Sequence, residues 1–81
     1  SLAAQRFELW CGQNQRDRLS DTQRYIVWEI TNYIVCSGAC SRADLSASKG
    51  RQFLMEAKSA FGSMDNVDKI LQSLSGFMLA A

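Results

Sequence analysis

The chain is 81 residues long, which is enough for one small domain and too short for two of ordinary size. Its hydrophobic content of 47% and charged content of 21% are those of a globular protein and exclude an intrinsically disordered one. A net charge of +1, from nine basic and eight acidic residues, does not predict the basic face that nucleic-acid-binding modules use. We therefore expect 1–81 to form a single folded domain.

The sequence contains no targeting or membrane-spanning signal. No apolar run approaches the roughly 20 residues that a transmembrane helix needs, and the N-terminal SLAAQRFELW lacks the pattern of a signal peptide. The cysteines Cys11, Cys36 and Cys40 are odd in number, whereas small secreted domains normally pair their cysteines. We therefore expect a cytoplasmic protein that has no disulfide and does not contact a membrane.

The first half of the chain predicts two helices. Leu2 to about Gln15 forms a rough apolar stripe in a chain without proline. Ser20 and Gln23 have the spacing of a capping box that opens a second helix, and Gly38 is the left-handed residue that ends it. The β-branched residues between them would also suit a strand, but a buried strand is rarely 16 residues long.

The second half predicts a short helix and two longer ones. Ser-Arg-Ala-Asp opens the short helix over 41–45, and the polar segment SASKGR follows it. A helix over 51–60 ends at Gly62, and Ser63 caps the last helix, which carries an apolar stripe to within about a turn of the chain end. The predicted fold is all-α, a compact bundle of four to five helices.

The predicted core follows from the apolar stripes of these helices, whose inward positions recur at three- and four-residue spacing. Its members are Ile26, Ile30, Ile34, Leu54, Phe61, Ile70, Leu74 and Phe77.

The sequence offers no recognisable catalytic chemistry. It has no His, no phosphate-binding Gly-rich loop, and carboxylates at capping or exposed positions, with Glu56 expected to point outward and no carboxylate pair expected to shift a pKa. Three thiols without His cannot complete a structural zinc site, so we interpret Cys36 and Cys40 as small packed residues. We expect no catalytic residue, no bound cofactor, no metal site and no enzymatic activity from these residues.

The aromatic residues leave two interpretations open. Trp10, Trp28, Tyr25 and Tyr33 could form a stacking platform for bases or an anchor for a partner protein, but aromatic residues at helical spacing more often belong to the core. Because the first helix is the least securely tied to the predicted core, we take Phe7 and Trp10 as candidate protein-interface residues.

The order of short motifs along the chain resembles the extreme C-terminal domain of the motor subunit (R, or HsdR) of type I restriction–modification enzymes. The matching pieces are Arg6-Phe7, Trp10, Leu19-Ser20-Asp21-Thr22-Gln23, Ile30, Ser37-Gly38, Asp44-Leu45, Phe61-Gly62 and Leu79-Ala80-Ala81. The chain departs from the family pattern where SASKGRQF replaces a proline- and glycine-rich loop.

The resemblance implies that 1–81 is a C-terminal fragment of a larger multidomain protein. That parent is an ATP-dependent DNA translocase and endonuclease, which uses ATP and Mg²⁺ at motifs that lie upstream. The fragment would supply a helical docking surface that binds the methyltransferase and specificity subunits. It would meet DNA through the parent complex, and none of the matched positions is catalytic in the family.

Two other functions remain open from the sequence. A helix-turn-helix DNA-binding or transcription-regulator domain is one, with 51–60 as the recognition helix, although its Arg51, Gln52, Glu56 and Lys58 are a weakly basic set. A small adaptor that binds protein partners is the other.

Overall fold

The computed structural model describes residues 1–13, 18–38, 42–46 and 49–78. The helices in this part of the chain are α1 (Leu2–Gln13), α2 (Asp21–Ser37), α3 (Arg42–Ser46), α4 (Gly50–Phe61) and α5 (Met64–Met78). These five helices, with no strand among the described residues, confirm the predicted all-α fold.

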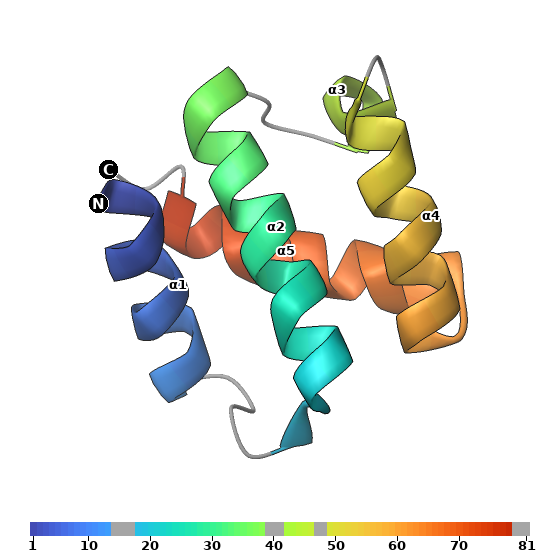
Figure 1. Ribbon diagram of the computed structural model, residues 1–81, viewed down its shortest axis with the longest axis horizontal. Coiled ribbons are helices and arrows are strands. Elements are labelled where there is room, and N and C mark those ends of the chain that lie inside the picture. The colour runs from blue at the N-terminus through green and yellow to red at the C-terminus, as the bar shows by residue number, and fades with distance from the viewer. Residues whose placement is uncertain (14–17, 39–41, 47–48, 79–81) are drawn as a thin grey trace.

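The helices are arranged in two layers (Figure 1). In one layer α2 lies between α1 and α4, and α5 crosses behind these three helices. The main contacts of the short α3 are with α4. Because α1 and α4 flank α2 and α5 crosses behind it, α2 meets solvent on the side that faces away from α5.

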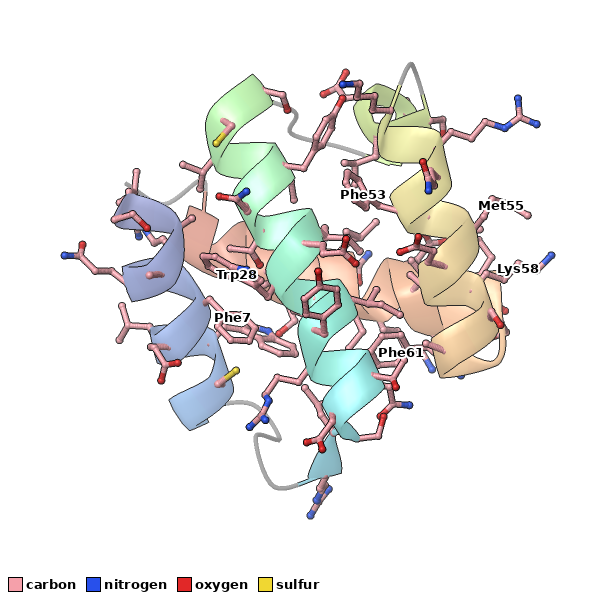
Figure 2. The ribbon with its side chains drawn as sticks, viewed as in Figure 1. Phe7, Trp28, Phe53, Met55, Lys58 and Phe61 are labelled. Atoms are coloured by element: carbon pink, nitrogen blue, oxygen red, sulfur yellow. The ribbon has the colours of Figure 1, made fainter. Side chains whose placement is uncertain are left out.

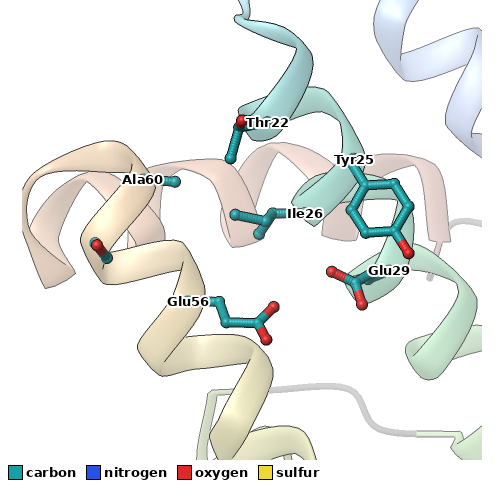
Figure 3. A pocket seen from close by; sticks show the side chains of 7 residues that line it. Thr22, Tyr25, Ile26, Glu29, Glu56 and Ala60 are labelled. Atoms are coloured by element: carbon teal, nitrogen blue, oxygen red, sulfur yellow. The ribbon is translucent and has the colours of Figure 1, made fainter.

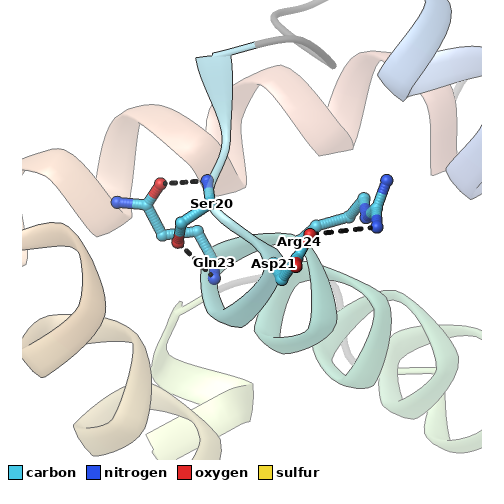
Figure 4. A network of polar contacts seen from close by, with 4 residues as sticks. All are labelled: Ser20, Asp21, Gln23 and Arg24. Atoms are coloured by element: carbon cyan, nitrogen blue, oxygen red, sulfur yellow. Dashed lines mark hydrogen bonds and ion pairs between the residues drawn. The ribbon is translucent and has the colours of Figure 1, made fainter.

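The helix ends form as the local sequence predicts. The Ser20 hydroxyl accepts a hydrogen bond from the Gln23 backbone N–H at 3.1 Å, and the Gln23 side-chain oxygen accepts one from the Ser20 N–H at 3.0 Å (Figure 4). Gly38 and Gly62 adopt the left-handed φ values of 75° and 90° that end α2 and α4. The Ser63 hydroxyl accepts a backbone hydrogen bond at the start of α5. The predicted Ser20 capping box, the Ser63 cap and the glycine stops at Gly38 and Gly62 are therefore confirmed.

The core lies where the two layers meet. Its buried side chains come from all five helices, and four of the predicted members, Ile26, Ile30, Leu54 and Leu74, are among them. Three more, Ile34, Phe61 and Ile70, are partly buried against this cluster. The side chain of Phe77 lies outside the described part of the chain. The predicted core was incomplete, because the core also contains Phe7, Trp10, Cys11, Val27, Leu45, Ala57, Val67 and Leu71.

The prediction that Cys36 is buried is wrong. Cys36, Ser37 and Gly38 are all exposed at the end of α2. Cys11 of α1 is instead the buried thiol among the described residues. Cys40 and the predicted cap Ser41 lie outside them.

Gly50, in the polar segment SASKGR, allows α3 and α4 to pack closely together. It is buried at the start of α4, against the carbonyl end of α3. A Cβ atom built on Gly50 would lie 2.8 Å from the Leu45 carbonyl carbon, closer than any side chain tolerates. The approach of α3 to α4 therefore requires glycine at this position.

Candidate docking surface

The structure places Phe7 and Trp10 inside the bundle. Trp10 is 1% exposed, and its indole N–H donates a 2.7 Å hydrogen bond to the Ser73 hydroxyl of α5. Phe7 is 9% exposed and packs edge-on against Trp28 of α2, with ring centroids 5.5 Å apart (Figure 2). These contacts hold α1 against the core. Phe7 and Trp10 were chosen as interface residues because the first helix was expected to be the least securely tied to the core, and the structure shows otherwise. As interface residues they stay a prediction: Phe7 lines a small groove between α1 and α2, whereas Trp10 would become accessible only if α1 moved.

Among the aromatic side chains that the structure describes, that of Tyr25 is the most exposed. Its side chain lies on α2 and is 62% accessible to solvent. Trp28 and Tyr33 are instead partly buried, Tyr33 against Phe53 with ring centroids 5.4 Å apart. Residues three and four apart lie on one face of a helix, so the sequence alone did not separate Tyr25 from its buried neighbours.

A groove lies beside Tyr25 between α2 and α4 (Figure 3). It encloses about 460 Å³ and is lined by Thr22, Tyr25, Ile26, Glu29, Glu56, Ser59 and Ala60. The Gln23 side-chain amide donates a 3.0 Å hydrogen bond to the Ala60 carbonyl oxygen, which fixes the two helices together at one end of the groove.

The groove contains a pair of carboxyl groups that the sequence analysis did not predict. Glu29 of α2 and Glu56 of α4 face one another across it (Figure 3). Burial, the charge of Glu56 and a hydrogen bond between the two carboxyl groups raise the pKa of Glu29 above its ordinary value. The expectations that no such pair exists and that Glu56 points outward are therefore wrong. The two residues are 27 positions apart, so only the packing of α2 against α4 brings them together.

A smaller groove lies on the other side of Tyr25, between α1 and α2. It encloses about 280 Å³ and is lined by Phe7, Asp21, Arg24, Tyr25 and Trp28. The Arg24 guanidinium donates a 3.3 Å hydrogen bond to the Asp21 carboxylate, so the charges of this groove cancel (Figure 4). We call the two grooves and Tyr25 between them the Tyr25 surface.

The outward face of α4 is the surface that the helix-turn-helix hypothesis would use. Arg51, Gln52, Met55 and Lys58 are exposed on it, and Met55 and Lys58 point away from the bundle (Figure 2). This face offers two cations and a largely exposed methionine, a weakly basic surface for a DNA backbone.

Comparison with known proteins finds no matching protein family, no matching curated protein and no matching solved structure. Among the described helices, none has the length and apolar character to cross a membrane. The same part of the chain contains no group of three or more His, Cys, Asp or Glu residues placed to hold a metal ion.

Proposed function

We propose that this chain is a non-catalytic helical docking domain. In the assembly that its motifs resemble, it joins the motor subunit of a type I restriction enzyme to the methyltransferase and specificity subunits, and the Tyr25 surface is the docking face. The observation that carries the proposal is the 62% exposure of Tyr25 between two grooves on an otherwise well-packed bundle. The adaptor hypothesis uses the same face with a different protein partner.

The Tyr25 surface has the physical features of a protein interface. Tyrosine gives a large contact area with few rotatable bonds, and its hydroxyl group tolerates either water or a polar partner. A concave surface on each side of the ring allows a partner to exclude water around it, which is the condition for a residue to dominate binding. The helix that carries Tyr25 is fixed by its capping box and by packing on both sides, so little ordering is needed on binding.

The proposal assigns the chemistry to other parts of the complex. With no His in the chain, the commonest general base is absent, and ATP and Mg²⁺ would serve the motor upstream. Paired carboxyl groups do serve as acid and base in some enzymes. Here they lie in an open groove whose other polar side chains are the hydroxyl groups of Thr22, Tyr25 and Ser59, which favours binding over catalysis.

The test measures assembly with the methyltransferase–specificity core, using the motor subunit and the 81-residue chain in parallel. Tyr25→Ala should weaken binding by about 30-fold, the loss of a binding hot spot. Met55→Ala is the matched control, because Met55 is similarly exposed at 57% and lies on the outward face of α4. Binding of both variants within twofold of the wild type would refute the Tyr25 surface as the docking face.

The helix-turn-helix function is kept as a second candidate because α4 exposes Arg51 and Lys58. Titration with duplex DNA at low salt tests it, since binding that neutralises phosphates weakens steeply as salt rises. Loss of salt-dependent binding in Arg51→Ala and Lys58→Ala, with Tyr25→Ala unchanged, would favour DNA binding over docking.

A further inference from the structure

The lining of the α2–α4 groove carries negative charge that no lining residue neutralises. Two of its seven residues are glutamates, and none is basic. We propose that this groove receives an arginine side chain of the docking partner, with the guanidinium between Glu29 and Glu56 and against the Tyr25 ring. The inference rests on the proposed docking function and names the chemistry that the partner must present.

The three side chains are placed to hold one planar cation. Tyr25 and Glu29 are four residues apart on α2 and so share a face, while Glu56 meets them from α4 (Figure 3). The two carboxyl groups face one another closely enough for the charge of Glu56 to raise the pKa of Glu29. A guanidinium presents its N–H donors in a rigid plane and can donate to two carboxylates at once, whereas a lysine ammonium is a point charge.

The rest of the groove suits the apolar part of an arginine. Ile26 and Ala60 are buried or partly buried lining residues that can pack against the methylene groups of the side chain. The Tyr25 ring is exposed enough for its face to receive the cation. A volume of about 460 Å³ lies within the range of small-ligand sites and leaves room for neighbouring residues of the partner.

The neighbouring charges do not satisfy the pair from within the described chain. Arg24 of α2 is bonded to Asp21 and lines the other groove. Arg51 and Lys58 of α4 are exposed and do not line this groove, and neither α1 nor α5 contributes a residue to its lining. A cation from a partner is therefore the group that complements the two carboxylates.

Binding should depend on pH. Burial and the charge of Glu56 raise the pKa of Glu29 and so favour its protonated form, whereas the guanidinium is best held when both carboxyl groups are ionised. Below the raised pKa, a proton must leave to solvent as the arginine binds, and above it the pair is already ionised. Affinity should therefore be highest above the raised pKa of Glu29 and fall by up to about tenfold per pH unit below it.

The experiment titrates the isotope-labelled 81-residue chain with N-acetyl-arginine amide and follows the Tyr25 ring and the Glu29 and Glu56 carboxyl carbons by NMR. N-acetyl-lysine amide and N-acetyl-citrulline amide are the comparison probes, the latter keeping the shape of arginine without its charge. We expect saturable shifts at all three residues with the arginine probe, at least about threefold weaker binding of lysine, and no binding of citrulline.

A charge-matched pair of variants locates the site. Glu56→Gln should weaken the arginine probe about tenfold at neutral pH, since half of the carboxylate pair is lost. Asp65→Asn removes the same charge from an exposed position on α5 and should change binding less than twofold. Circular dichroism melting of both variants checks that they remain folded, and Glu29→Gln, which also keeps the side-chain volume, repeats the test if Glu56→Gln does not fold.

The outcomes separate this inference from the docking function. Citrulline binding as tightly as arginine, lysine binding more tightly, or equal effects of the two charge variants would overturn the arginine site. If the chain binds the methyltransferase–specificity core but not the arginine probe, the inference alone fails. If it binds the arginine probe but not the core, the site stands and the proposed assembly is wrong.

Discussion

The two flanks of α2 differ in how they are closed. On the α1 side, which we call the closed flank, Trp10 is buried and bonded to Ser73 of α5, and Phe7 packs against Trp28, so that only the smaller of the two grooves remains. On the α4 side, two carboxyl groups and an exposed tyrosine line a groove. Apolar residues chosen as interface anchors thus lie on the closed flank, while the open flank is marked by polar residues. In this bundle the partly buried carboxyl pair and the exposed Tyr25 mark the open flank, whereas Phe7 and Trp10 mark the packed one.

Trp10→Ala should have the largest effect on stability, because it opens the closed flank. Removing an indole that is 1% exposed leaves a cavity and an unpaired Ser73 hydroxyl, at a cost of about 3–5 kcal/mol. A domain of this size has little more stability than that, so we expect a largely unfolded protein by urea titration. Tyr25→Ala, on the open flank, should change the unfolding free energy by less than about 0.5 kcal/mol. Similar losses in both variants would remove the distinction between the flanks.

Gly50→Ala tests the packing that places α4 beside the groove. The new methyl group would meet the Leu45 backbone, which cannot rotate away as a side chain would, so we expect a loss of about 1–3 kcal/mol. Gly12→Ala is the matched control, since nothing lies within 4 Å of its added Cβ and helix propensity favours alanine by up to about 1 kcal/mol. Opposite shifts of the thermal midpoint are expected. A neutral Gly50→Ala would show that α3 can move away from α4.

How much the sequence predicts depends on how local each feature is. Ser20, Gln23, Gly38 and Gly62 act within one or two helical turns, so their roles followed from spacing and were confirmed. The central core of α2 followed from its periodicity. The burial of Trp10, the need for Gly50 and the Glu29–Glu56 pair depend on which helices meet and at what distance. No spacing along one helix contains that information.

Gln23→Ala should weaken the end of the α2–α4 flank. The Gln23 side chain completes the capping box with Ser20 and also donates to the Ala60 carbonyl oxygen of α4. Loss of both contacts should cost about 1–2 kcal/mol, measured by urea unfolding. Gln52→Ala, at an exposed position of α4, removes a glutamine side chain without such contacts in the described structure and should stay within about 0.5 kcal/mol of the wild type. Equal effects would mean that the Gln23 bridge to α4 does not stabilise the fold.

Glu29→Gln should have the smallest effect on the unfolding free energy. The sign of that effect distinguishes a carboxylate kept for binding from one that stabilises the fold. Folding raises the pKa of Glu29. Between the unfolded and folded pKa values, the folded protein therefore keeps a proton that the unfolded chain has already released. The contribution of Glu29 is therefore fully present below the unfolded pKa and is lost as pH rises through the folded pKa. At about pH 7 the ionised pair then destabilises the fold, by no more than about 1 kcal/mol because solvent screens half-buried groups.

Glutamine resembles the protonated acid, so Glu29→Gln should unfold at higher urea than the wild type at about pH 7 and at the same urea at about pH 3.5. Urea titrations at the two pH values measure this difference directly. A variant that is less stable at about pH 7 would mean that the carboxylate stabilises the fold through a contact of its own. Increased stability would instead mean that the chain keeps a carboxylate pair that weakens its own fold, as expected of charge held for a cationic partner.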